Sequence, residues 1–222
     1  LIAQLLWDQS EDGAGARRWL DEVLEYDREH EAAHRLLAEI AEEEEDWAEA
    51  ARHLEVAVSV AGGGVDAVET QRRLARLYLE KLHDTARAQA HFEAVLEAAP
   101  GDSMALEGIK EAQLAREDWP GLVASLGLEL GLLLGRPEGM SLEVLRSLKA
   151  SSVAVALRVP ASQIVSEVAE VVEEKLGEQE GARALWGLAY QLWPEHVEAL
   201  ERRIKLDRAC EDPAALAEDL EA

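Results

Sequence analysis

The chain has 222 residues, of which 48% are hydrophobic and 31% charged, a composition typical of a folded sequence rather than a disordered one. Asp and Glu outnumber Lys and Arg by 46 to 22, which gives a formal net charge of −24. This charge argues against binding to nucleic acid or to anionic membrane surfaces, because their phosphates would be repelled. It favours a basic partner.

The single cysteine, Cys210, leaves no intramolecular disulfide and no Cys-x-x-Cys metal cluster. The most apolar run, residues 126–134, is far shorter than the roughly 18 residues of a membrane-spanning helix, so no membrane insertion is expected. The first residues, LIAQLLWDQSED, lack the basic start of a secretion signal. We therefore expect a soluble, cytoplasmic protein, with secretion left open because the sequence begins at Leu1 rather than Met.

Helical periodicity runs along the whole sequence, and the alternating pattern of β-branched residues that predicts strands is nearly absent. Short breaks rich in Gly and Pro divide the chain into helices of roughly 12–18 residues. The breaks fall at 12–13, 62–64, 100–101, 135–137, 160 and 194. The sequence therefore predicts an all-α protein.

A frame of small and large residues recurs within these helices. The second helix of one segment reads Ala50-x-x-x-Leu54-x-x-Ala57, with Gly62 five residues later. The same spacing returns as Ala16, Leu20, Val23; as Ala88, Phe92, Val95; and as Ala182, Trp186, Ala189. An acidic residue stands four positions before each leading alanine, and before Leu122 in a related segment: Asp12, Asp46, Asp84, Glu178 and Asp118.

A longer duplication supports the repeat. Residues 81–100 align without gaps to residues 175–194, and the same offset of 94 carries 116–126 onto 210–220. The steps from Asp12 to Asp46 and from Asp84 to Asp118 are both 34 residues. A fixed period of this length is typical of helical arrays.

The pattern resembles the tetratricopeptide repeat (TPR) family. Leu74, Ala75 and Tyr78 fill first-helix positions of that family's motif, and the second helix and turn carry Ala88, Phe92, Val95 and Pro100. The resemblance implies a right-handed α-solenoid of antiparallel helix pairs, with about five to six repeats. It also implies a protein-interaction scaffold without catalytic activity or cofactor.

The frame covers residues 1–126 and 162–222, and residues 127–161 do not keep it. In the first repeat the leading helix is truncated, with Trp7 in the aromatic position. We interpret 127–161 as a degenerate repeat or an inserted helix, with Ser141 to Val159 forming a further helix before Pro160. The whole chain is expected to form one continuous solenoid.

The stretch His30-Glu31-Ala32-Ala33-His34 matches the zinc-peptidase pattern H-E-x-x-H, which gives an alternative: a zinc-dependent hydrolase using His30, Glu31 and His34. In the repeat frame, however, His30 is the last turn residue and His34 the fourth residue of a first helix. The extended motif also fails, because Leu37 and Ile40 replace its Gly and third His. His53, a further conceivable ligand, is expected to point outward. We therefore expect no metal.

In TPR-like arrays the first helices line the concave groove, so first-helix positions are the candidate site. Many of these positions are acidic, which predicts binding of a basic or amphipathic segment of a partner protein, with apolar residues adding affinity. The alternative is that glutamates stand there only as good helix formers. The candidate groove residues are Glu39, Glu42, Glu43, Arg72, Arg76, Leu79, Met104, Glu107, Glu111, Leu114, Glu170, Glu173 and Glu174.

Two further interpretations follow from the frame. The tryptophans fall mostly at repeat positions and are assigned to packing between helices: Trp7, Trp19, Trp47, Trp119, Trp186 and Trp193. A clamp for the carboxylate of chaperone tails is disfavoured, because the sequence has no asparagine and the groove is acidic. A third function to be weighed is self-assembly into a homo-oligomer, through the end repeats or the apolar segment 141–159.

Overall fold

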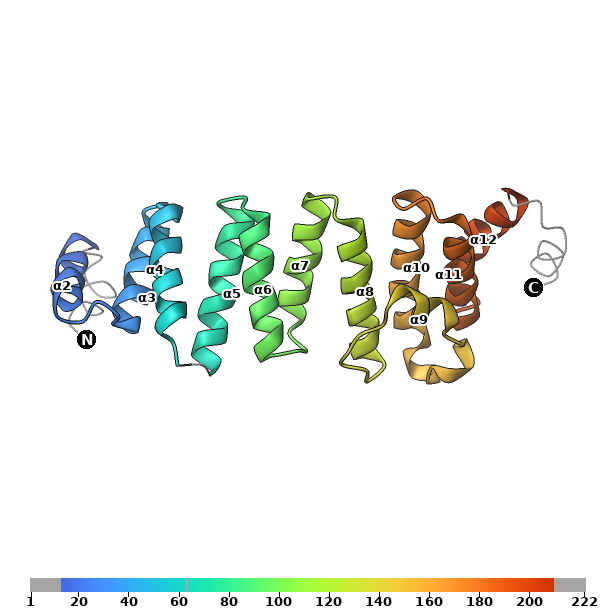
Figure 1. Ribbon diagram of the computed structural model, residues 1–222, viewed down its shortest axis with the longest axis horizontal. Helices are drawn as coiled ribbons and strands as arrows, with labels where there is room; N and C mark the ends of the chain where they lie inside the picture. Colours follow the sequence, from blue (N-terminus) through green and yellow to red (C-terminus); the bar gives the residue numbers. More distant parts are fainter. Residues whose placement is uncertain (1–12, 63, 210–222) are drawn as a thin grey trace. The chain divides into compact units, whose positions relative to one another are not determined.

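The computed structural model describes residues 13–62 and 64–209. That part of the chain forms eleven α-helices and two 3-10 turns and contains no strand (Figure 1). The helices are α2 (Gly13–Tyr26), α3 (Glu31–Glu43), α4 (Trp47–Val60), α5 (Val65–Glu80), α6 (Thr85–Ala98), α7 (Ser103–Ala115), α8 (Trp119–Leu133), α9 (Leu142–Ser147), α10 (Arg158–Glu174), α11 (Gln179–Leu192) and α12 (Val197–Ala209). The predicted all-α class is confirmed.

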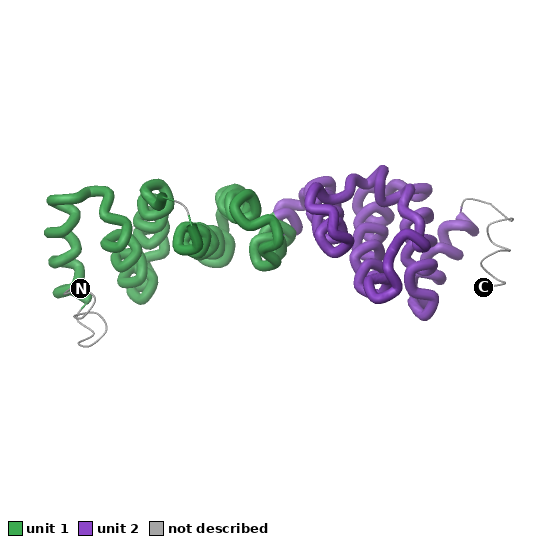
Figure 2. The backbone as a smooth tube through the Cα atoms, turned by 90° about the horizontal axis from the view of Figure 1, so that it is seen from below, with its two compact units in different colours: residues 1–112 green, residues 113–222 purple. Residues whose placement is uncertain are grey.

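The chain divides into two units, residues 1–112 and 113–222, coloured green and purple in Figure 2. In unit 1, α3 packs against α4 and α5 against α6; in unit 2, α10 packs against α11. Helices of successive pairs also contact one another, as α4 does α5 and α11 does α12. The predicted architecture of consecutive helix pairs is confirmed, whereas the handedness and the continuity of the solenoid across the two units stay predictions.

The same turn joins the first and second helices of the pairs. Four acidic residues of the sequence frame, Asp46, Asp84, Asp118 and Glu178, occupy N-cap positions. The carboxylates of the three aspartates accept a hydrogen bond from the backbone N–H three residues on, at 2.9, 3.0 and 3.1 Å. Such caps stabilise a helix by about 1 kcal/mol each. The residue before each cap has a positive φ: Glu45 (59°), His83 (53°), Glu117 (54°) and, before Glu178, Gly177 (69°).

The recurring frame marks the cores. All four leading alanines, Ala16, Ala50, Ala88 and Ala182, have no exposed surface. The large residue four positions later is also buried in each case. A small side chain lets two helix backbones approach closely, and the large one fills the space beside it. The frame therefore specifies how neighbouring helices pack, which we call the packing rule. The buried large residues are Leu20, Leu54, Phe92 and Trp186.

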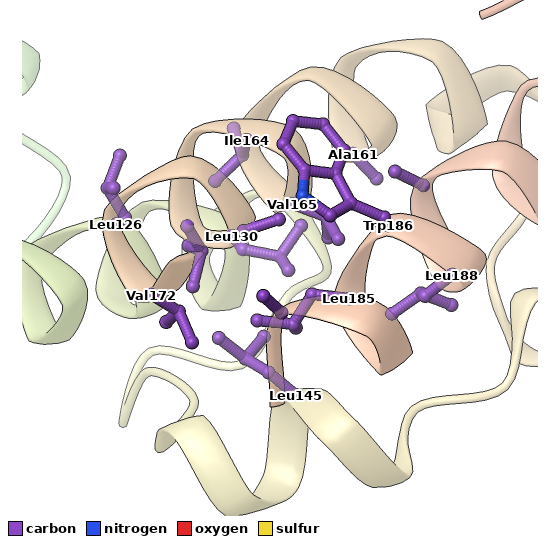
Figure 3. Close-up of a cluster of buried hydrophobic side chains, with 14 of the residues drawn as sticks. Leu126, Leu130, Leu145, Ala161, Ile164, Val165, Val172, Leu185, Trp186 and Leu188 are labelled. Carbon is purple, nitrogen blue, oxygen red and sulfur yellow. The ribbon is translucent and has the colours of Figure 1, made fainter. Parts of the chain in front are cut away.

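The core of unit 2 is drawn in Figure 3. Leu126 and Leu130 from α8 meet Val165 and Val172 from α10, and Leu185 and Trp186 from α11 close the cluster. Leu145 joins it from the segment outside the repeat frame and has no exposed surface. The extra segment is therefore part of the core of unit 2.

The expectation of one helix from Ser141 to Val159 is wrong. The segment forms the short α9, two 3-10 turns (η1, Ala150–Ser152, and η2, Val155–Leu157) and then enters α10 at Arg158. The hydroxyls of Ser147 and Ser152 donate to the carbonyl oxygens of Val144 and Lys149, three residues back. Such local side-chain hydrogen bonds compete with the backbone hydrogen bonds of a continuous helix. The segment instead forms short helical turns that pack against the rest of unit 2.

Several sequence-based expectations lie outside the described residues: Trp7, Asp12 and the truncated first helix at one end, and Cys210 with the duplicated 210–220 at the other. Within 13–62 and 64–209, none of the helices combines the length and apolarity needed to span a bilayer.

The packing rule can be tested at Gly108 of α7. A methyl group there would run into the ring of Phe92, a buried residue. We expect Gly108→Ala to destabilise the protein by about 1–3 kcal/mol, the usual cost of overpacking, which lowers Tm by about 2–4 °C per kcal/mol. Circular dichroism on heating measures this.

Gly187→Ala is the matched control. It also lies inside a helix, but its new methyl would meet only the side chain of Arg203, at 3.4 Å or more. We expect an unchanged or slightly raised Tm, because alanine is the better helix former. Equal Tm losses in both variants would contradict the close-packing account.

Candidate interaction site

The first-helix positions of unit 1 surround a pocket of about 370 Å³. Of the predicted groove residues, Glu42, Arg72, Arg76 and Met104 line it, so α3, α5 and α7 contribute together. Six lining residues were absent from the prediction: Trp47, Glu69, Arg73, Leu77, Glu80 and Lys81.

Three of the side chains that line the pocket are apolar. Leu77 is buried, Trp47 is half-buried and Met104 is 42% exposed. The ammonium group of Lys81 lies 4.7 Å from the centre of the Trp47 ring, a cation–π contact between the second helix of one pair and the end of the next first helix. A partner side chain that enters this pocket would meet both apolar and charged side chains.

The charge of α3 is largely compensated within the chain. Arg73 donates from Nε and Nη2 to the two carboxylate oxygens of Glu42, at 2.9 and 2.8 Å, and from Nη1 to Glu39, at 3.2 Å. Burial alone would lower the pKa of Arg73, but the bonds to Glu42 and Glu39 outweigh it and raise the pKa above its usual value. These two glutamates therefore tie α3 to α5.

Arg72 makes the corresponding link from α5 to α7. It donates to Asp102, the residue before α7, and to Glu69 on its own helix. Burial acts to raise the pKa of Asp102, yet the N–H of Ala105 and the guanidinium of Arg72 hold that pKa below its usual value. Arg76, by contrast, is an exposed side chain 3.8 Å from Glu80.

Exposed acidic residues lie on two of the helices that line the pocket, α3 and α7. Glu107 and Glu111 are exposed and share one face of α7 with Met104, because residues three and seven positions apart lie along one stripe of a helix. Glu43 is also exposed, at the end of α3. Leu79 is 8% exposed and belongs to the core, so its side chain offers a partner little surface.

In unit 2 the predicted acidic residues of α10 surround an arginine of α12. Arg202 lies 3.4 Å from Glu173, 3.0 Å from Glu174 and 3.9 Å from Glu170. The hydrogen bond with Glu174, with the other carboxylates, raises the pKa of Arg202. Glu173 also accepts from the indole N–H of Trp186 at 2.9 Å, so this cluster joins α10, α11 and α12.

The structure separates the residues of the H-E-x-x-H pattern. His30 is the N-cap of α3, and its Nδ1 accepts from the N–H of Ala33 at 3.2 Å. His34 is the fourth residue of α3, as the frame predicts. Because His30 lies outside the helix, the two imidazoles do not form the shared helical face that a zinc site of this type needs.

The expectation that His53 points outward is wrong. Its Nδ1 lies 2.9 Å from Nδ1 of His34, and the two ring centres are 5.2 Å apart. Zn–N bonds are about 2.0–2.1 Å, so nitrogens facing each other at this distance leave no room for an ion between them. Among residues 13–62 and 64–209, no three His, Cys, Asp or Glu side chains are grouped as metal ligands.

No protein-family model and no curated protein matches the sequence. Solved structures do match over most of the chain. PilW, described as a widely conserved type IV pilus biogenesis factor, is 17% identical, with 98% of this chain and 87% of PilW covered and a TM-score of 0.41. YrrB, a TPR protein described as having an unusual peptide-binding site, is 12% identical, with 91% and 89% covered and a TM-score of 0.43.

The C-terminal part of a TPR repeat-containing protein from Cytophaga hutchinsonii is 11% identical, with 99% of this chain and 76% of that chain covered and a TM-score of 0.47. The chain is similar in structure to TPR proteins. The TPR-like character of the chain stands on its own helix pairs and repeated turn.

Unit 2 holds a second pocket, of about 390 Å³, between α9, α11 and α12 of the TPR-like array. Three arginines line it, and each forms an ion pair with an acidic residue of the chain. Arg146 pairs with Glu178, and Arg183 and Arg203 lie 2.5 and 3.7 Å from the fully buried Asp207. Since these cations already have acidic partners, the pocket does not stand out as a site for an anion.

The two arginines of α5 allow a test of the inter-helix link. We expect Arg73→Met to destabilise the protein by about 1–2 kcal/mol, because Glu42 and Glu39 lose charge-assisted bonds at a partly exposed site. Arg76→Met removes only an exposed pair and should change stability by less than about 0.5 kcal/mol. Urea denaturation measures both, and equal effects would show that the bonds of Arg73 have no special part in stability.

Proposed function

We propose that the chain is a non-catalytic protein-interaction scaffold that binds a basic or amphipathic segment of a partner protein on the first helices of unit 1. The observation that carries the proposal is the pocket between α3, α5 and α7, which is lined by both apolar and charged residues. The resemblance to TPR proteins implies protein binding as well.

The pocket suits an apolar anchor side chain. Met104 offers an adaptable apolar surface, and Trp47 and Leu77 are the other apolar residues that line the pocket. Protein segments commonly bind with one or two buried apolar anchors, which supply most of the affinity. The pocket volume of about 370 Å³ is enough for one large side chain of this kind.

The electrostatic part of the proposal rests on fewer residues than the sequence suggested. Arg73 compensates Glu39 and Glu42, so attraction for a basic segment falls mainly on Glu43, Glu107 and Glu111, which are exposed. The net charge of −24 adds a long-range field that speeds the approach of a basic partner. In this proposal the partner segment is amphipathic, with an apolar anchor between basic residues.

The two alternative functions have less support. A zinc hydrolase would need His30 and His34 together, yet His30 caps α3 and His34 bonds to His53. For self-assembly through 141–159, Leu145 and Val153 are buried in the core of unit 2, which leaves Val144, Val155 and Val159 as the exposed large apolar side chains of this segment. The end repeats lie partly outside the described residues.

Selection from a random peptide library displayed on phage tests the proposal. We expect the selected peptides to combine an apolar residue with neighbouring Lys or Arg, and their binding to weaken as salt is raised. Met104→Glu should weaken binding by about tenfold or more, because it replaces an apolar residue of the pocket lining with a charged one.

Val197→Glu is the matched control, since Val197 is an apolar residue of unit 2 that is 63% exposed. It adds the same charge at a residue that does not line the pocket and should leave binding unchanged. Selected peptides that are acidic, or that bind Met104→Glu as well as the parent protein, would refute the proposed site.

A further inference from the structure

A pair of histidines joins three elements of unit 1. His34 of α3 faces His53 of α4 through their Nδ1 atoms at 2.9 Å, and Nε2 of His34 lies 3.0 Å from the carbonyl oxygen of Arg28, in the turn between α2 and α3. His34 is only 6% exposed, whereas the side chain of His53 is 20% exposed. One buried imidazole thus holds both a turn and the next helix.

The hydrogen-bond partners determine where the protons are. A carbonyl oxygen only accepts, so Nε2 of His34 must carry the proton that it donates to Arg28. A neutral His34 then has its lone pair on Nδ1, and Nδ1–H of His53 donates to it. Three of the four ring nitrogens can carry a proton in this arrangement, but the fourth cannot, since two N–H groups would then face each other.

We propose that the His34–His53 pair is an acid-sensitive latch, which holds α4 against α3 at neutral pH through the hydrogen bond between the two Nδ1 atoms and opens when the pair takes up its last proton. On opening, His53 turns toward solvent, because it is the more exposed of the two. His34 is then left with a charge in a buried position and loses its bond to α4.

The surrounding charges are mixed. Glu49, on the same helix, lies 4.0 Å from Nε2 of His53 and favours a protonated ring. Arg17 of α2, which bonds to Glu49 at 2.9 Å, and Arg52 of α4 oppose it. Burial is the largest influence and, with the neighbouring His34, lowers the pKa of His53 below its usual value of 6.5.

The direction of the pH effect follows from proton linkage. The unfolded chain protonates His53 as pH falls through about 6.5, whereas burial in the latched state lowers the pKa of His53 and delays this protonation. The unfolded or open state therefore binds more protons, so the stability of the latch is fully present above about pH 6.5 and is lost progressively below it.

The imidazole NMR signals of the full chain, recorded from pH 8 to pH 5, test the latch. At pH 8 we expect His34 to carry its proton on Nε2 and His53 on Nδ1. On acidification the backbone signals of residues 28–34 should shift in step with the His53 ring. In His53→Asn the side-chain amide donates at every pH, so this step should disappear.

His83→Asn is the matched control. His83 is exposed and has a positive φ of 53°, which asparagine also tolerates, and this variant should keep the step. A proton on Nδ1 of His34 at pH 8 would overturn the proposal, even if His53→Asn failed to fold. A step in residues 28–34 that persists in His53→Asn would overturn it as well.

Discussion

The close approach of consecutive helices at fully buried alanines is the constraint on which both units depend. Ala50, Ala88 and Ala182 have no exposed surface, and each is followed one turn later by a large buried side chain. A helix pair cannot bury both its faces alone, so stacking of neighbours completes the core. The positive-φ turn and the acidic N-cap fix where each second helix begins, and thereby place its alanine against the preceding helix.

The second organising feature is the use of charge inside the array. Arg73 joins α5 to two glutamates of α3, and Arg202 joins α12 to three of α10. These bonds run between first helices of neighbouring pairs, along the face that we propose for partner binding. Acidic composition therefore does two different things here: some carboxylates hold repeats together, and others stay exposed. Only the exposed ones can attract a partner strongly.

The periodic features were predictable from the sequence, because local rules determine them. The frame of alanine and large residues predicted the buried positions, and the acidic residue four positions earlier proved to be the N-cap of helices such as α4 and α6. Features that depend on how helices meet were missed. The direction of His53 depends on how α3 and α4 pack, and the role of Arg73 depends on the spacing of α3 and α5. The 34-residue separation of Glu39 and Arg73, one repeat length, was the available signal.

The segment outside the repeat frame shows how a departure is absorbed. The N–H of Met140 donates to the carbonyl of Gly127 at 3.0 Å, and a methyl group on Gly127 would collide with the carbonyl oxygen of Met140. A glycine in α8 thus lets the extra segment lie directly on the helix backbone, and Met140, Leu145 and Val153 then enter the core of unit 2. The buried apolar residues of this segment stabilise its own unit, whereas Met104 and Trp47 of the proposed anchor site line a pocket of unit 1.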